Sequence, residues 1–117
     1  MSDLPPKGKL VRDGIPDLIR DQGGTPQLTR LAANQRQAAL LAKLREEADE
    51  LAAAEGTERL GELGDVLEVV RALADELGVT WAEVEAAAGA KRAARGAFAE
   101  GWWWHGNLVA TKRSQRG

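Results

Sequence analysis

The apolar residues in the middle of this chain recur three and four positions apart, the spacing that places them on one face of an α-helix. The clearest run lies in residues 58–77 and consists of Leu60, Leu63, Leu67, Val70, Leu73 and Leu77. A second run, in residues 34–54, consists of Leu40, Leu41, Leu44, Ala48 and Leu51. Gly56 and Thr57 lie between the two segments. A turn this short predicts two antiparallel helices whose apolar stripes face one another or a shared partner.

Capping signals predict where the helices begin. Asn34 followed by Gln37 is a variant of the capping box and predicts the start of the first long helix. Thr80 followed by Glu83 is a regular capping box and predicts the start of a third long helix, which frays near Gly96. The second long helix is expected to stop at Gly78, because glycine accepts the left-handed conformation that ends many helices.

The remaining segments complete an all-helical arrangement. A short helix is predicted over residues 16–20, opened by a proline in its first turn. Isoleucine is rare and tyrosine absent, so strand-forming residues are scarce. We expect one domain over residues 9–110, with a flexible start at 1–8 and a flexible basic tail at 111–117. The predicted fold is an all-α antiparallel bundle that forms a dimer or tetramer to complete its small core.

Composition excludes several classes of function. The chain has 117 residues and no cysteine, which removes disulfides, thiolate metal sites and cysteine nucleophiles. Its formal charge of −2 offers no electrostatic reason to expect nucleic-acid binding. No run is apolar enough to span a bilayer and no signal-peptide pattern is present, so the expectation is a cytoplasmic protein without a membrane partner.

Two pairs of carboxylates are matched across the predicted turn. Glu47 and Glu50 lie three residues apart on the first long helix, and Glu62 and Asp65 repeat that spacing on the second. Glu50 precedes Gly56 by as many residues as Glu62 follows it, and the same holds for Glu47 and Asp65. In an antiparallel hairpin, equal distances from the turn mean equal heights, so the two pairs are expected to meet.

The position of these carboxylates on the helix faces favours a metal site. Glu62 falls inside the apolar arc of its helix, and Asp65 and Glu47 lie at the borders of their stripes. Burying a carboxylate without a partner costs free energy, on the order of several kcal/mol for each group. A divalent cation between the carboxylates would offset this cost. Oxygen ligands without histidine or cysteine select magnesium, manganese or calcium over zinc. A single ExxE is usually solvated surface; the matching across the turn is what distinguishes this set. Glu46 points away from the stripe and is assigned to the outer shell.

Basic residues near these acids are candidates for binding phosphate. Lys43 lies one turn before Glu47, although a simple Glu–Lys pair within the helix explains it equally well. Lys91 and Arg95 on the third long helix form a second candidate patch, and Lys9 and Arg12 near the start form a third. Each of these would alone more often be solvated surface.

The acidic pattern resembles that of a known superfamily. EEADE at residues 46–50 and ELGD at 62–65 resemble the signature of the MazG-like nucleotide pyrophosphohydrolases. KLVRDGIPDLI at 9–19 and KRAARGAF at 91–98 resemble its phosphoribosyl-ATP pyrophosphohydrolase-like branch. The resemblance implies magnesium-dependent cleavage of a nucleoside triphosphate between the α and β phosphates, giving a monophosphate and pyrophosphate. It assigns the metal ligands and the leading glutamate of the signature to Glu47, Glu50, Glu62, Asp65 and Glu46, and it implies a homodimer or homotetramer.

The chain departs from the superfamily pattern at several positions. The interval between its two acidic motifs is slightly short, Gly14 replaces the lysine common in that branch, and Ala97 replaces a glycine. Gly61 and Gly64 interrupt a helix, and a close helix approach near the metal is one explanation. These departures bear on substrate choice. The alternatives are phosphoribosyl-ATP hydrolysis in histidine biosynthesis and a helical module that binds a nucleotide or a partner protein without turnover.

An aromatic cluster follows the third long helix. Trp102, Trp103 and Trp104 are adjacent in a segment that is expected to be extended, and His105 follows them. The tryptophans either cover a dimer seam or stack on a base, and packing is favoured because adjacent residues of an extended segment point to opposite sides. His105 is assigned to surface or packing.

Overall fold

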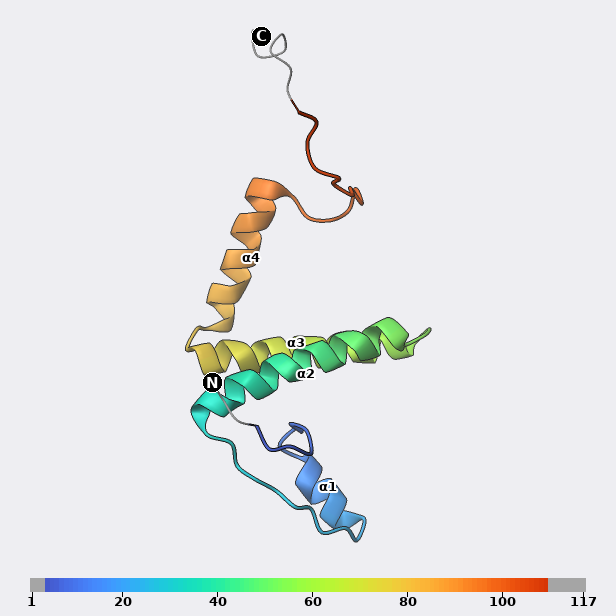
Figure 1. Cartoon of the computed structure of the whole chain (residues 1–117), viewed down its shortest axis with the longest axis vertical. Coiled ribbons are helices and arrows are strands. Elements are labelled where there is room, and N and C mark those ends of the chain that lie inside the picture. The colour runs from blue at the N-terminus through green and yellow to red at the C-terminus, as the bar shows by residue number, and fades with distance from the viewer. Residues whose placement is uncertain (1–3, 110–117) are drawn as a thin grey trace. The chain divides into compact units, whose positions relative to one another are not determined.

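The computed structural model describes residues 4–109, which contain four α-helices and no strand. The helices are α1 (Ile15–Asp21), α2 (Ala33–Ala53), α3 (Glu58–Leu77) and α4 (Trp81–Arg95) (Figure 1). The prediction of an all-α fold is confirmed. The predicted basic tail at 111–117 and the first three residues of the predicted flexible start lie outside the described residues.

The chain divides into two compact units, of which the first ends at Ala86 and the second begins at Ala87. The first unit contains α1, α2, α3 and the first residues of α4. None of the helices within residues 4–109 is long and apolar enough to cross a lipid bilayer.

Most helix ends follow the predicted capping signals. α3 has the predicted bounds and ends at Gly78, whose φ of 75° is left-handed. At the start of α4 the Thr80 N–H donates to Glu83 Oε1 at 2.9 Å, and the Glu83 N–H donates to Thr80 Oγ1 at 3.1 Å. These two bonds satisfy backbone donors that a helix start leaves without partners. The bond from the Thr80 N–H, with a second one from the Thr80 hydroxyl to the same Glu83 oxygen at 3.0 Å, lowers the pKa of Glu83 because both favour its ionised form.

The predicted cap of α2 is wrong by two residues. The N-cap is Ala32, with an extended backbone, and Asn34 lies inside the helix. The Ala32 N–H donates to Gln35 Oε1 at 2.8 Å, so the glutamine three residues into the helix supplies the return bond of a capping box. Alanine has no side-chain acceptor, and the missing half explains why the sequence pattern pointed to Asn34.

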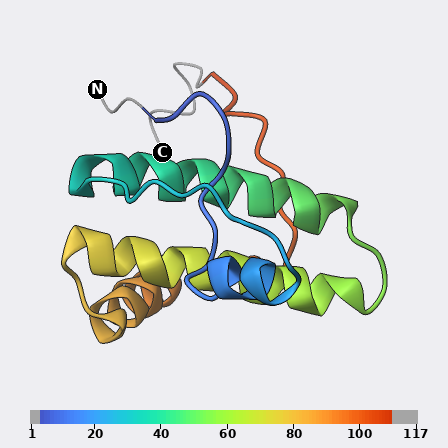
Figure 2. The same ribbon diagram turned by 90° about the horizontal axis from the view of Figure 1, so that it is seen from below.

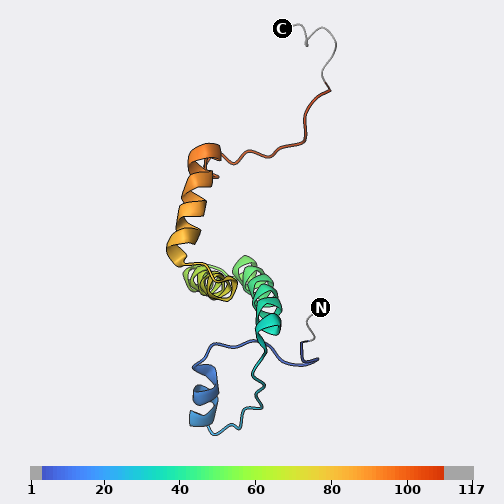
Figure 3. The same ribbon diagram turned by 90° about the vertical axis from the view of Figure 1, so that its left-hand side faces the viewer.

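Helices α2 and α3 form the predicted antiparallel hairpin and run side by side (Figures 1 and 2). Seen along their axes, they form a single pair within the first unit (Figure 3). The buried apolar residues are Ala39, Leu40, Ala54, Val69 and Ala74. Gly56 makes the turn with a φ of 56°, and Arg59 Nε donates to the Ala54 carbonyl at 2.9 Å. Because three of the five core residues are alanine, the hairpin buries little apolar volume.

The leucine stripe of α3 does not form the seam with α2. Leu60 is 77% exposed, and the remaining exposed members of the stripe are Leu63, Leu67 and Leu77. Only Val70 and Leu73 of the predicted stripe are half-buried. The helix period specifies which residues share a face, but the rotation of α3 about its axis decides which face meets α2. This stripe is therefore an exposed apolar surface.

The segment after α4 has no regular secondary structure through residue 109. Trp102, Trp103 and Trp104 are largely exposed, and Trp104 Nε1 donates to Asn107 Oδ1 at 3.1 Å. The packing expected for the tryptophans is thus not made within the second unit.

Candidate metal centre

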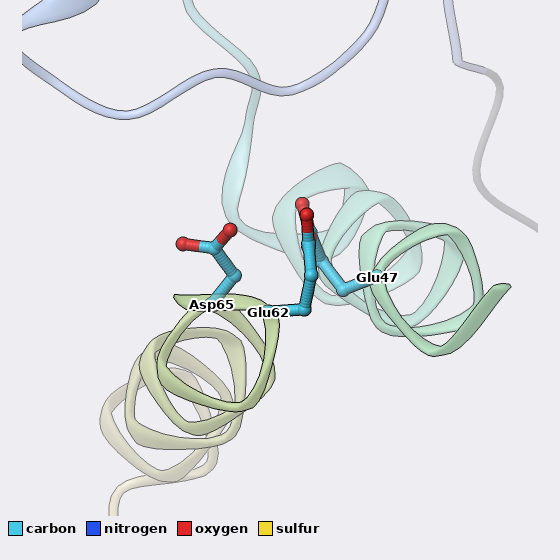
Figure 4. A group of neighbouring side chains, drawn as sticks. All are labelled: Glu47, Glu62 and Asp65. Carbon is cyan, nitrogen blue, oxygen red and sulfur yellow. The ribbon is translucent and has the colours of Figure 1, made fainter. Parts of the chain in front are cut away.

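Three carboxylates from the two long helices converge on one point. Glu47 comes from α2, and Glu62 and Asp65 come from consecutive turns of α3. One oxygen from each of them lies within 4.8 Å of the others (Figure 4). The short turn at Gly56 brings them level, as the counting from the turn predicts. This group of three, here called the acidic centre, can hold a metal ion.

The acidic centre is poorly solvated for a set of charged groups. Glu47 is buried and only 6% exposed, and Glu62 and Asp65 are half-buried. Glu47 Oε2 and Glu62 Oε2 are both buried without a hydrogen-bond partner among the residues that the structure describes. An unpartnered buried carboxylate oxygen is costly, and a cation between the helices would satisfy both atoms. The residues present therefore fit a hard divalent ion that prefers oxygen ligands.

Crowding of negative charge also perturbs the acids. Burial raises the pKa of Glu62 above its ordinary value, and the charges of Asp65 and Glu47 raise it further. A hydrogen bond with Glu47 raises the pKa of Glu50, followed by the charge of Glu47. Both shifts mean that the folded chain disfavours full ionisation of this cluster unless positive charge is supplied.

Two other acids of the sequence motif lie beside the acidic centre and not within it. Glu50 is exposed and lies close enough to Glu47 for that residue to raise its pKa. Glu46 is half-buried and contacts two lysines: Lys9 Nζ lies 3.8 Å from its Oε1 and Lys43 Nζ lies 3.4 Å from its Oε2. One face of α2 therefore supplies Glu47 to the centre, while Glu46 and Glu50 flank it.

Two basic side chains touch the acidic centre directly. Arg12 Nη2 lies 2.6 Å from Asp65 Oδ1, and Lys43 Nζ lies 3.4 Å from Glu47 Oε1. Burial alone would lower the pKa of Lys43, but hydrogen bonds and charges of Glu46 and Glu47 outweigh it and raise that pKa. Lys43 thus stays a cation, and both interpretations of it, ion pair and phosphate contact, remain compatible with its position.

The second candidate basic patch belongs to a different unit. Lys91 and Arg95 lie on the last turns of α4, beyond Ala86, and both are exposed. The acidic centre is built without them.

The two glycines of α3 are not explained by close packing. A Cβ atom on Gly61 or Gly64 would meet no atom of the described chain within 4 Å. The expectation of a close helix approach at these positions is therefore wrong for the contacts within this chain.

A groove beside the acidic centre contains residues that the sequence analysis did not single out. It has a volume of about 390 Å³ and is lined by Glu47 and Asp65 at one end and by Arg36 and Glu76 farther along the same two helices. Arg36 precedes Glu47 by eleven residues, and Glu76 follows Asp65 by eleven. Eleven residues are close to three helical turns, so this spacing was the signal that placed both residues on the faces of the acidic centre.

Part of the chain is similar to a protein of known sequence. No family model matches the chain, and no solved structure matches it. A stretch of 47 residues, 40% of the chain, is 53% identical to an uncharacterized protein of Mycolicibacterium smegmatis (strain ATCC 700084 / mc(2)155). The match covers 48% of that protein, so the chain spans about half the length of this curated relative.

Proposed function

We propose that this chain is a magnesium-dependent nucleotide pyrophosphohydrolase. It would hydrolyse a nucleoside triphosphate or related nucleotide between the α and β phosphates and release a monophosphate and pyrophosphate. The observation that carries the proposal is the convergence of Glu47, Glu62 and Asp65 with two unpartnered buried oxygens, directly beside two basic side chains. The resemblance of the acidic motifs to the MazG-like superfamily points to the same reaction.

Magnesium is the preferred ion for this centre, and manganese is the alternative. Three carboxylates with no histidine or cysteine form a hard donor set, which disfavours zinc. Magnesium is commonly held by few carboxylates together with water and substrate phosphates, so an incomplete protein shell suits it. Bound there, the ion would supply a Lewis acid for the phosphate oxygens and a more acidic water.

The acidic and the basic residues have different roles in the proposed reaction. Glu47, Glu62 and Asp65 hold the ion, and Glu50 adds negative charge beside them. Arg12 and Lys43 neutralise carboxylates in the free chain. When a cation takes over that neutralisation, both side chains become available to the phosphate oxygens of the substrate. In the reaction, a water oxygen would add to the α-phosphorus and lose a proton to solvent. The bond from that phosphorus to the α–β bridging oxygen would break, and pyrophosphate would leave with that oxygen.

The exposed leucine stripe supports a further part of the proposal, assembly of the chain as a homodimer or homotetramer. Its members Leu60, Leu63, Leu67 and Leu77 lie on one helix and are exposed. Monomeric proteins seldom expose contiguous apolar patches, which mark interaction surfaces. Because a subunit with so small a core gains from covering this face, a second copy is the expected occupant.

The test of the proposed reaction is product analysis over a panel of ribo- and deoxynucleoside triphosphates together with phosphoribosyl-ATP. In the presence of magnesium we expect release of pyrophosphate and not of orthophosphate. With manganese we expect a reduced or altered rate of pyrophosphate release, and with a chelator we expect no release. Activity confined to phosphoribosyl-ATP would favour the histidine-pathway alternative. Silence over the whole panel, with magnesium still bound, would contradict hydrolysis and favour the module without turnover.

A further inference from the structure

Eight residues on α2 and α3 form two matched rows along the groove. They share the spacing four, three, four on each helix: Arg36, Leu40, Lys43 and Glu47 on α2, and Asp65, Val69, Ala72 and Glu76 on α3. This spacing keeps each row on one helical face, and all eight residues line the groove of about 390 Å³. Because the helices are antiparallel, the row that starts at the acidic centre on α3 runs beside the row that ends there on α2.

The two ends of the groove carry different chemistry. One end holds Glu47 and Asp65 of the acidic centre; the other holds Arg36 and Glu76, about 16 Å farther along the helix axes. Arg36 Nε lies 2.6 Å from Glu76 Oε1, and Arg36 Nη1 donates to the Leu31 carbonyl at 3.4 Å. One end of the groove thus carries the carboxylates that can hold a cation, and the other carries a paired hydrogen-bond donor and acceptor. The stretch between the two ends includes apolar side chains.

The far pair is accessible from the groove. Both residues line the groove, and their side chains are 45% and 22% exposed, so neither is sealed from a ligand there. Exposed ion pairs contribute little to stability, typically less than about 1 kcal/mol. Holding α2 against α3 is therefore a minor role for this pair. Leu40 and Val69, which are both buried, supply an apolar floor between the two ends. Small-molecule sites commonly combine such a lining with a few convergent polar groups.

We infer that Arg36 and Glu76 form the base-reading end of the site, with the nucleotide lying along the groove and its phosphates at the acidic centre. This inference rests on the proposed function. The arginine fork donates two parallel hydrogen bonds to adjacent acceptors, and the carboxylate accepts from amino and imino groups. Guanine presents adjacent acceptors at O6 and N7 and donors at N1 and N2, and arginine pairs with that acceptor pair in a characteristic way. A guanine nucleotide therefore fits this end of the groove best.

Two variants separate base reading from a structural tie. Arg36→Lys keeps the positive charge opposite Glu76 but loses the planar fork. The double variant Arg36→Glu/Glu76→Arg restores an ion pair with donor and acceptor exchanged. Arg45→Gln is the control, because Arg45 is an exposed arginine of α2 that does not line the groove.

The measurements are kcat/KM for pyrophosphate release from guanine, adenine, cytosine and uracil nucleotides, and calorimetric binding of the corresponding monophosphates with magnesium. We expect Arg36→Lys to lower the guanine-to-adenine ratio of kcat/KM about 10- to 100-fold, the effect of losing hydrogen bonds to a charged group. We expect the exchanged pair to recover the thermal midpoint of the wild type without recovering its base preference, and Arg45→Gln to keep that preference.

Two results would overturn the inference. A wild-type base preference that Arg36→Lys leaves unchanged would remove this pair from recognition, as would an exchanged pair that restores preference and stability together. Either result would leave pyrophosphate release, and with it the proposed function, intact. Conversely, base-selective monophosphate binding that depends on Arg36 in a chain without turnover would support the inference while contradicting hydrolysis.

Discussion

The two faces of α3 reverse the distribution expected for an amphipathic helix. The face toward α2 carries Glu62, Asp65 and Glu76, all at least half-buried, whereas the opposite face carries leucines, with Leu60 77% exposed. Burying carboxylates and exposing leucines are both unfavourable for an isolated chain. Under the proposed function, a cation and its nucleotide ligand complete the acidic face, and a second copy of the chain covers the leucine face.

The largest expected effect comes from the acidic face. Glu62→Gln keeps the size of the side chain and removes its charge, so the centre loses a ligand for the ion. We expect turnover to fall about 1000-fold or more, since loss of several kcal/mol of transition-state stabilisation has that consequence. Steady-state pyrophosphate release measures it.

The control for this change is Glu55→Gln in the exposed turn, which we expect to keep full activity. Circular dichroism of Glu62→Gln should show the wild-type helix content, because the variant removes repulsion and no packing. Near-normal turnover in the variant would exclude Glu62 from the site.

A second test removes the leucine face. The double variant Leu60→Glu/Leu67→Glu places two charges on the exposed stripe, where we expect them to prevent association of the chain. Sedimentation velocity should then show a monomer at concentrations at which the wild type is a dimer or tetramer.

The matched control for the leucine face is Leu18→Glu on α1, a leucine with 55% exposure that lies outside the stripe. It should leave the oligomeric state unchanged. A wild type that is already monomeric would show that the leucine face is not an interface between copies.

The pH dependence of stability is the third test. The pKa values of Glu62 and Glu50 are raised above the ordinary value of 4.5, so between that value and their raised values the folded chain binds more protons than the unfolded one. The stability of the metal-free chain should therefore fall as the pH rises through this window. Thermal unfolding between about pH 4.5 and pH 7 measures the slope.

Saturating magnesium should weaken or reverse this slope, because the ion favours the ionised carboxylates that the protons otherwise neutralise. Glu62→Gln should flatten the slope of the metal-free chain. A metal-free chain whose stability rises steadily over the same pH window would contradict the crowding of negative charge on the acidic face.

The smallest expected effect concerns the helix backbone between the two faces. No atom of the described chain lies within 4 Å of a Cβ placed on Gly64, so Gly64→Ala should raise the free energy of unfolding by about 0.5–1 kcal/mol. Gly78→Ala is the opposite case, since a φ of 75° strains any residue with a Cβ, and it should destabilise the chain.

Chemical denaturation of both variants provides the measurement. A Gly64→Ala chain that is more stable but inactive would show that substrate or a second copy approaches α3 closely at this position. A loss of stability in Gly64→Ala would contradict the open space found there.

The sequence by itself determined the hairpin and the level of its carboxylates. The helix period and the short turn are local properties, so counting residues from Gly56 was enough to predict that Glu47 lies close to Glu62 and Asp65. The Thr80–Glu83 capping box was likewise readable, because it links residues within one turn.

The tertiary structure decided which face of each helix is used. Rotation about a helix axis depends on which side chains fit the seam, and here alanines and Val69 pack inside while the leucine stripe stays exposed. That rotation brings Glu47, and not Glu50, into the acidic centre. It also pairs Arg12 with Asp65, which lie far apart in the chain and which no local period relates. Arg36 and Glu76, by contrast, are equally distant from Gly56, so the same counting relates them.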